Sequence, residues 1–213
     1  MKTEKRRRGP YATGSARRSE IITAAADLVT AAGHVDLTMA QVAAEAGVSE
    51  ATVLYHYPSK DHLFAATMVE IDARQQSLVA ESLTTWDTPT GISRATSDAQ
   101  DHPHARRLYV KVMADAADPA HPGHDYARTH LEMIRSHMAA ALVQRQSEGL
   151  AHPSIVPERF AVQMAAIWDG LTTQWLIDPT LDLTAEVLEA FRRLSGQDAM
   201  EAKRAMEQLA ADL

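Results

Sequence analysis

Residues 33–64, GHVDLTMAQVAAEAGVSEATVLYHYPSKDHLF, decide the fold of this chain. Thr38 is a favourable helix N-cap, and Gln41 three residues later completes a capping-box pattern. Gly47 can take the left-handed backbone conformation that ends a helix, which residues with a Cβ atom resist. The pattern therefore predicts a short helix that begins after Thr38 and ends before Gly47.

A second short helix is predicted directly after this glycine. Ser49 is placed to cap it, and it should run from about Glu50 to His56. Pro58 prevents its continuation, and a further helix should start near Lys60. Two short helices separated by Gly-Val-Ser form a helix-turn-helix, which places its second helix in the major groove of DNA.

The order of these signals resembles the DNA-binding domain of the TetR family of transcriptional repressors. Family sequences typically show Thr-hydrophobic-Tyr-aromatic-His-Phe followed by Lys, and here the corresponding segment is TVLYHYPSK, residues 52–60. The resemblance extends upstream to Arg17–Gly33 and downstream through Leu63 and Phe64. One position departs from it: Leu54 stands where many members have a tyrosine whose hydroxyl commonly reaches phosphate. The alternative is a helical hairpin inside an unrelated bundle.

Charge is distributed unevenly along the chain. The net charge is −7, yet residues 1–20 hold seven lysines or arginines against two glutamates. An acidic chain with one basic end fits a protein that brings only that end to phosphate. A basic solvated tail is the plainer interpretation, and the two are compatible because such arms order on meeting DNA.

Composition excludes several classes of protein. The chain of 213 residues has no cysteine, so a disulfide framework and a thiolate site are excluded. No apolar run approaches the ~18 residues of a membrane helix, and no apolar segment follows the basic N-terminus as in a secretory signal. We expect a cytoplasmic protein without a membrane partner.

Helical periodicity dominates, which predicts an all-α fold. We expect a disordered basic arm over residues 1–15, a three-helix helix-turn-helix domain over 16–62, and a helical bundle for effector binding and dimerisation over 63–213. The helices expected outside the motif cover residues 16–32, a long stretch from Lys60, and 104–117, 124–148, 158–177, 185–194 (capped by Thr184) and 197–213.

The position of a residue in the second helix of the motif predicts its role in DNA binding. Its first residues approach base edges, whereas its far end and the next helix start meet phosphates. Glu50 could accept from a cytosine amino group, and Ala51 or Thr52 could pack on a thymine methyl group. For each residue the alternative is a purely structural role. The predicted DNA-binding residues are Arg6, Arg7, Arg8, Thr38, Ser49, Glu50, Ala51, Thr52, Tyr55, His56 and Lys60.

The C-terminal part is rich in large, adaptable apolar side chains, which line cavities as readily as they fill cores. In the family that this chain resembles, the C-terminal part binds a small effector. The effector-binding candidates are Trp86, Tyr109, Met113, Met133, His137, Met164 and Trp168. Ordinary helix core is the alternative for each of them.

Histidine is abundant, with ten in the chain. Imidazole suits zinc and nickel, and His121 and His124 flank one loop. No His-x-x-x-His pair occurs, however, and no thiolate assists. We therefore expect no metal and no cofactor.

The segment from Ile167 to Pro179 resembles the family's penultimate core helix. With the helix after Thr184 it would build a four-helix interface across a two-fold axis. Internal core is the competing interpretation. The predicted dimer-interface residues are Ile167, Gly170, Leu171, Gln174, Trp175, Leu188 and Phe191.

The resemblance implies a homodimeric transcriptional repressor that binds a pseudo-palindromic DNA operator and is released by a small, mostly apolar effector. No Gly-rich phosphate loop or Gly-x-Ser-x-Gly nucleophile motif is present, so we do not expect an enzyme. Two alternatives stay open: a helical enzyme or ligand carrier that merely contains this motif, and an effector-free activator or architectural DNA binder.

Overall fold

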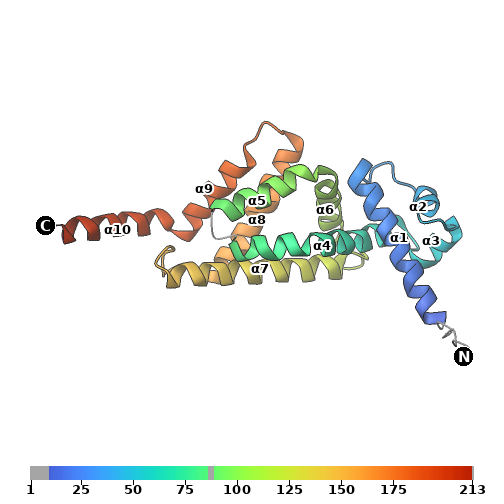
Figure 1. The fold of residues 1–213 in the computed structure, drawn as a ribbon, viewed down its shortest axis with the longest axis horizontal. Coiled ribbons are helices and arrows are strands. Elements are labelled where there is room, and N and C mark those ends of the chain that lie inside the picture. The colour runs from blue at the N-terminus through green and yellow to red at the C-terminus, as the bar shows by residue number, and fades with distance from the viewer. Residues whose placement is uncertain (1–9, 86–88, 213) are drawn as a thin grey trace, which may run out of the picture. The chain divides into compact units, whose positions relative to one another are not determined.

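The computed structural model describes the backbone of residues 10–85 and 89–212 and the side chains of residues 14–74 and 90–212. Within these ranges the chain is helical and contains no strand, which confirms the all-α prediction (Figure 1). Ten helices are described: α1 (Pro10–Ala32), α2 (Met39–Glu45), α3 (Glu50–His56), α4 (Lys60–Thr85), α5 (Pro89–Asp101), α6 (Pro103–Asp115), α7 (His124–Ser147), α8 (Pro157–Ile177), α9 (Leu183–Ser195) and α10 (Gln197–Ala211). Among the described helices, none combines the length and apolar character needed to cross a membrane.

The chain divides into two compact units. The first unit comprises Met1–Arg74 and Arg107–His124, and the second comprises Gln75–Arg106 and Asp125–Leu213. The end of α6 and the loop after it therefore group with the helix-turn-helix. This grouping joins segments far apart in the sequence, which spacing along the chain does not predict.

The first unit is built on α1, α2 and α3, where α1 contacts α2 and α2 contacts α3. Fully buried side chains from each helix form its core, among them Ile21, Val29, Val42 and Val53. Burial of these side chains removes apolar surface from water and sets the position of α3. The exposed side of α3 is thereby held at a fixed place on the unit.

The turn between α2 and α3 forms as predicted. Thr38 and Gln41 make both hydrogen bonds of the capping box, and Ser49 caps α3. Gly47 has φ +64°, the left-handed conformation expected of it, and the Val48 N–H donates to the Ala43 carbonyl at 2.9 Å. The predicted bounds of α3, Glu50 to His56, are confirmed.

The second unit has its core between α5, α7, α8 and α9. Phe160 and Phe191 meet edge to face with ring centroids 5.7 Å apart, and Met164 and Leu142 are fully buried beside them in the same cluster. Helix α8 packs on α9, and α5 also contacts α9, where the Thr96 and Thr184 hydroxyls lie 2.7 Å apart. These contacts pack α8 and α9 against each other within the second unit.

Several predicted boundaries differ from the structure. Helix α1 begins at Pro10 rather than near Ala16, so it extends into the stretch expected to be disordered. Residues 89–101, which are not among the predicted helices with stated bounds, form the continuous helix α5. The cap of α9 is Asp182, whose carboxylate accepts from the Ala185 N–H at 3.0 Å, and not Thr184. Asp182 is the N-cap because it directly precedes Leu183, the first helical residue of α9, and an N-cap residue must lie there.

Candidate nucleic-acid interface

Helix α3 presents one buried and one exposed side. Val53 is fully buried and attaches the helix to the first unit, while Glu50, Ala51 and Leu54 are exposed. Tyr55 is 83% exposed, the largest value among the exposed large hydrophobic side chains of the described residues. A helix with a free polar and aromatic side of this kind can enter a groove without disturbing its own core.

The hydroxyl groups at the two caps already have structural partners. Ser49 Oγ accepts from the Thr52 N–H at 3.2 Å, and the Ser49 and Thr52 hydroxyls lie 2.8 Å apart. Thr38 Oγ accepts from the Gln41 N–H at 3.1 Å and bonds Gln41 Oε1 at 2.9 Å. The structural role that the sequence analysis kept open for Thr38, Ser49 and Thr52 therefore exists, and any DNA contact would use their remaining hydrogen-bonding capacity.

Tyr55 and His56 lie next to each other at the end of α3. Their rings meet edge to face with centroids 5.1 Å apart, so each restricts the other's orientation. Leu54 is 42% exposed on the same helix and carries no polar atom. The tyrosine hydroxyl that the family pattern places at position 54 is therefore missing, and Tyr55 is the exposed phenol nearest to it.

The start of α4 is a second candidate contact. Lys60 is exposed, and Ser59 caps the helix by accepting from the His62 N–H at 3.3 Å. The first amide groups of a helix have no internal partner and carry partial positive charge, so this turn can bind phosphate. Lys60 adds a full positive charge at the same place.

Arg18 and Tyr57 form a contact that sequence analysis missed. The Arg18 guanidinium lies 5.4 Å from the centre of the Tyr57 ring, and its Nε donates to the Tyr57 hydroxyl at 3.3 Å. Burial raises the pKa of the Tyr57 phenol, although the nearby guanidinium opposes this shift. The pair links α1 to the end of α3 across 39 positions of sequence, a separation that no local spacing rule addresses.

This pair borders an open groove of about 320 Å³ in the first unit. The residues lining the groove are Ser15, Arg18, Ser19, Ile22, Tyr57, Ala66, Val69 and Glu70. None of the predicted effector-binding residues is among them.

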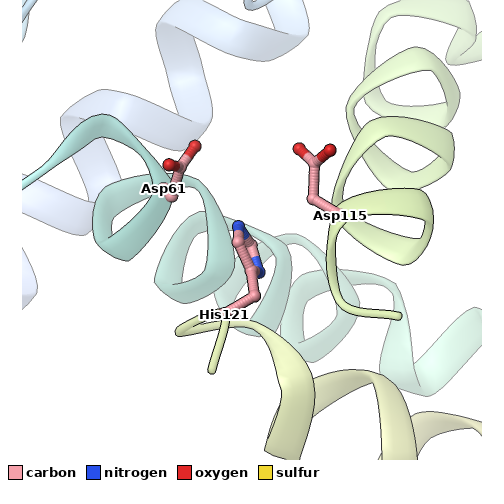
Figure 2. Close-up of side chains that lie close together, drawn as sticks. All are labelled: Asp61, Asp115 and His121. Atoms are coloured by element: carbon pink, nitrogen blue, oxygen red, sulfur yellow. The ribbon is translucent and has the colours of Figure 1, made fainter. Parts of the chain in front are cut away.

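Asp61, Asp115 and His121 gather at the start of α4 and are called here the Asp61 cluster. Their nearest ligand atoms lie within 4.8 Å of one another, and a ring nitrogen of His121 points toward the two carboxylates (Figure 2). Lys111 joins them, with its Nζ 2.5 Å from Asp115 Oδ2 and 3.9 Å from Asp61 Oδ1. Its hydrogen bond lowers the pKa of Asp115.

The donor set of the Asp61 cluster fits an ion pair better than a metal centre. The Gly123 N–H donates to His121 Nδ1 at 3.1 Å, so the neutral ring carries its proton on Nε2. A metal-bound histidine offers one unprotonated nitrogen to the ion and donates from the other, which is the opposite of what Nδ1 does here. Lys111 also supplies the positive charge that two carboxylates attract. His124 bonds elsewhere, with Nδ1 2.9 Å from the Ala116 carbonyl.

The predicted effector-binding residues are divided between the two units. Tyr109 and Met113 lie in the first unit, and Tyr109 is 7% exposed. The members in the second unit are Met133, His137, Met164 and Trp168. His137 is exposed, with Nδ1 2.8 Å from the Met133 carbonyl, whereas Met164 is fully buried in the core. Trp86 and the basic residues Arg6, Arg7 and Arg8 lie outside the described residues.

The predicted dimer-interface residues differ in exposure. Trp175 and Phe191 are 9% and 3% exposed and belong to the core of the second unit, so these two side chains offer little free surface. Gly170 and Gln174 are exposed on α8. The remaining members, Ile167, Leu171 and Leu188, are partly buried against the same core. Helical periodicity identifies the apolar side of a helix but does not tell whether that side packs within its own chain or against a partner.

Comparison with protein families supports the helix-turn-helix interpretation. Residues 21–67 match the family described as "Bacterial regulatory proteins, tetR family", which confirms the resemblance predicted from residues 17–64. No match is found among curated protein sequences.

Solved structures share the fold over most of the chain. A TetR transcription regulator from Haloarcula marismortui is 26% identical, with a TM-score of 0.64 over 87% of this chain and 98% of that one. A TetR-family regulator from Rhodococcus sp. is also 26% identical, with a TM-score of 0.62 over 84% and 99%. The FadR repressor from Thermus thermophilus, solved with lauroyl-CoA, is 20% identical, with a TM-score of 0.60 over 83% and 92%.

Proposed function

Because this chain carries a TetR-family DNA-binding domain and the fold of TetR-family regulators, we propose that it is a dimeric, ligand-responsive transcriptional repressor. The observation that carries the proposal is the exposed side of α3. This side holds Glu50, Ala51 and Tyr55 on a helix that Val53 and the Ser49 cap keep in place.

Different residues recognise the DNA bases and bind the phosphate backbone. Glu50, Ala51 and Thr52, in the first turn of α3, face base edges and supply sequence preference. Lys60 and the first amides of α4 bind the phosphate backbone and fix the register without reading sequence. Tyr55 and His56 extend the contact at the end of α3, where Tyr55 takes the place of the phenol that Leu54 lacks.

The basic arm is a further part of this DNA contact. Residues 1–15 precede or begin α1 and carry Arg6, Arg7 and Arg8. Neutralising phosphates releases counterions and makes affinity depend on salt, so the arm adds affinity and steepens that dependence. It adds no sequence preference of its own.

Two copies are needed because a pseudo-palindromic operator presents the same half-site twice. The dimer face we assign lies on α8 and α9, which pack together in the second unit. Gly170 offers room there: a Cβ atom at this position would have no neighbour within 4 Å in its own chain. Gln174 and Gly170 are exposed one turn apart, whereas Trp175 and Phe191 support the face from beneath.

The effector is a mostly apolar small molecule bound in the C-terminal part of the chain. Large apolar side chains such as Met133 and Trp168, which are not fully buried, suit an acyl or aromatic group better than a highly charged metabolite. The similar FadR was solved with lauroyl-CoA, a molecule with a long apolar chain. The effector lowers DNA affinity because it prefers the arrangement of the dimer that does not fit the operator, and DNA lowers effector affinity by the same factor.

Substitutions in the two classes of DNA contact test this proposal. Lys60→Ala should weaken binding to all operator variants about equally, whereas Glu50→Ala should change preference at particular base pairs. Fluorescence anisotropy on a panel of single-base operator variants measures both. The matched controls are Arg128→Ala, an exposed cation on α7, and Glu45→Ala, an exposed carboxylate at the end of α2.

Two results would contradict the proposal. A change in base preference from Lys60→Ala but not from Glu50→Ala would show that α3 is docked wrongly. Ligand binding or turnover with no sequence-specific DNA affinity would favour a helical carrier or enzyme.

A further inference from the structure

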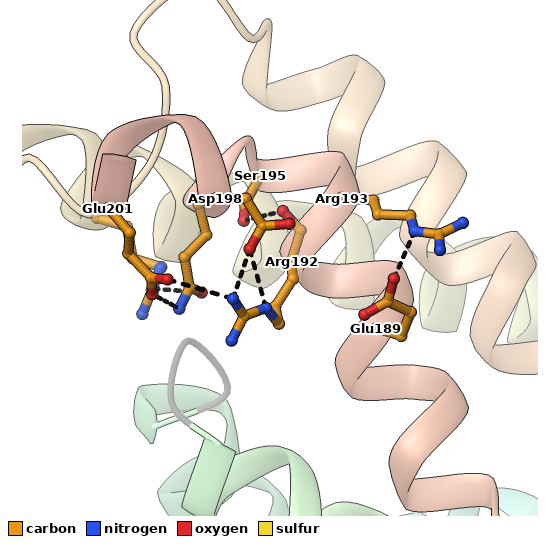
Figure 3. A network of polar contacts seen from close by, with 8 residues as sticks. Glu189, Arg192, Arg193, Ser195, Asp198 and Glu201 are labelled. Atoms are coloured by element: carbon orange, nitrogen blue, oxygen red, sulfur yellow. Dashed lines mark hydrogen bonds and ion pairs between the residues drawn. The ribbon is translucent and has the colours of Figure 1, made fainter. Parts of the chain in front are cut away.

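Arg18 of α1 differs from several other arginines of the chain in what its guanidinium contacts. Arg17, directly before it, pairs with Glu20 at 2.8 Å. At the end of α9, Arg192 and Arg193 are likewise joined to carboxylates, as Figure 3 shows. Arg18 is exposed and forms no ion pair with any of the described residues. Its positive charge is therefore available to a negatively charged partner.

The Tyr57 phenol holds this guanidinium by one edge. Arg18 Nε donates to the Tyr57 hydroxyl at 3.3 Å, and the guanidinium carbon lies 5.4 Å from the centre of the ring. Tyr57 is itself 2% exposed, and its backbone N–H donates to the Val53 carbonyl at 2.8 Å at the end of α3. The terminal nitrogens of Arg18, Nη1 and Nη2, have no hydrogen-bond partner among the described residues. A planar pair of N–H donors of this kind matches two oxygens of a phosphate.

Tyr57 also ties Arg18 to the start of α4. Only Pro58 and Ser59 separate Tyr57 from Lys60, the first residue of that helix. At about 3.8 Å between consecutive Cα atoms, the Cα atom of Lys60 lies within about 11 Å of that of Tyr57. Phosphates of one DNA strand follow one another at about 3.4 Å along the duplex axis. Two cations attached to so short a segment can therefore meet different phosphates of the same strand.

We propose that Arg18, held by Tyr57, binds a second phosphate of the operator strand that Lys60 contacts. This contact rests on the proposed function and adds a residue to it. The sequence pattern that this chain resembles has tyrosine at position 54 and phenylalanine at position 57, whereas this chain has Leu54 and Tyr57. The hydroxyl at position 57 belongs to a buried side chain, and it orients a cation instead of reaching phosphate itself. Arg18 is thus the phosphate-binding group, and Tyr57 is its positioning residue.

Packing alone does not account for the contact between Arg18 and Tyr57. Helix α1 already packs on α2, and α2 on α3, through fully buried side chains such as Ile21 and Val53. One hydrogen bond from an exposed arginine to a neutral phenol adds little stability, because ordering a long side chain costs conformational entropy. In a DNA complex the same ordering is an advantage, since a side chain that is already held loses less entropy when it binds phosphate.

Substitutions at the two positions should differ in how they change DNA binding. Arg18→Ala removes the charge, so it should weaken binding about fivefold and lower the slope of log affinity against log salt concentration by about one. Tyr57→Phe keeps the charge, so it should weaken binding about threefold and leave the slope unchanged. Arg17→Ala is the matched control and should change affinity less than about twofold, because Arg17 is already paired with Glu20. Fluorescence anisotropy measures each full-length variant on the operator duplex found by footprinting and on a duplex of unrelated sequence.

Two further variants test whether Tyr57 acts through Arg18. Tyr57→Phe should have no additional effect when it is combined with Arg18→Ala. Arg18→Lys should keep the salt slope but weaken binding about threefold, because an ammonium group lacks the planar pair of donors. Thermal unfolding without DNA checks that each variant folds.

An unchanged salt slope in Arg18→Ala, or additive effects of Arg18→Ala and Tyr57→Phe, would overturn the proposal. Failure of the proposed function gives a different result, because the wild type would then bind both duplexes equally. The effect of Arg18→Ala on the salt slope would still be measured on the unrelated duplex, since a phosphate contact carries no sequence information.

Discussion

The two units expose different kinds of side chain around their buried cores. In the first unit, α3 buries Val53 and exposes a polar and aromatic side, the surface that a charged duplex requires. In the second unit, the aromatic pair Phe160 and Phe191 is buried, while α8 and α10 expose small and apolar side chains. Under the proposed function, the first unit meets DNA and the second meets a second copy of the chain.

Removing an aromatic ring from the second unit should have the largest effect. Phe160 is 1% exposed and packs edge to face on Phe191. Phe160→Ala should lower the free energy of unfolding by about 3–5 kcal/mol, because transfer and cavity costs add. Chemical denaturation measures it, with the exposed Val156→Ala as a control expected to change stability by less than about 0.5 kcal/mol. Similar effects from both variants would show that Phe160 is not core.

Gly47 in the first unit and Gly196 in the second have the same left-handed backbone conformation, so the effects of Gly→Ala on stability can be compared between the units. Gly47 has φ +64° with nothing within 4 Å of an added Cβ, whereas Gly196 has φ +66° and its Cβ would lie 2.7 Å from His152 Cβ. Gly47→Ala should cost about 1–2 kcal/mol of unfolding free energy from left-handed strain alone. Gly196→Ala should cost about 1–3 kcal/mol more, because overcrowding adds to the same strain. Equal thermal shifts for the two variants would refute the close approach at Gly196.

A substitution at Gly170 should distinguish an effect on dimer association from an effect on folding. A Cβ atom added there would have open space around it, so Gly170→Leu should not crowd a single copy at its point of attachment and should leave its stability nearly unchanged. In the dimer it should overpack the α8 contact and cost about 1–3 kcal/mol of association free energy. Sedimentation equilibrium measures the effect, with Ala140→Leu, exposed on α7, as the control. A wild-type monomer at micromolar concentration would contradict the assigned face.

The smallest expected effect concerns Tyr57 in the first unit. Burial raises the pKa of its phenol above the ordinary value of 10.0, so the folded state favours the neutral form. Its contribution to stability is complete below a pH of about 10 and is lost as the pH rises through the higher folded value. Tyr57→Phe should remove this loss. The test measures the unfolding free energy of the wild type and of Tyr57→Phe at neutral and at strongly alkaline pH. If both proteins lost the same amount of stability on going to alkaline pH, the burial of the phenol would be contradicted.

Local signals made the first unit the more predictable one. The capping box at Thr38, the cap at Ser49 and the glycine turn each depend on residues within a few positions, and these features form as the sequence predicts. The contacts between Arg18 and Tyr57 and between Lys111 and Asp61 join residues far apart in sequence. They depend on how helices pack, which spacing along the chain does not encode.

The second unit shows the limit of helical periodicity. The apolar pattern of α8 located the helix correctly, because burial on any side gives the same period. It did not distinguish Trp175, which is buried in its own chain, from Gly170, which is exposed. The same limit applies to the effector-binding residues, which the sequence grouped by chemistry and the structure divides between two units.

A footprint of the wild-type protein on the DNA upstream of its own gene tests the central claim most directly. We expect one protected pseudo-palindrome whose half-sites are centred about one helical turn of DNA, or a multiple of it, apart. Protection should saturate with two copies of the chain per site and disappear in the Lys60→Ala variant at the same concentration. Equal binding to unrelated DNA at physiological salt, with no protected region, would contradict the assignment of α3 as a base-reading helix.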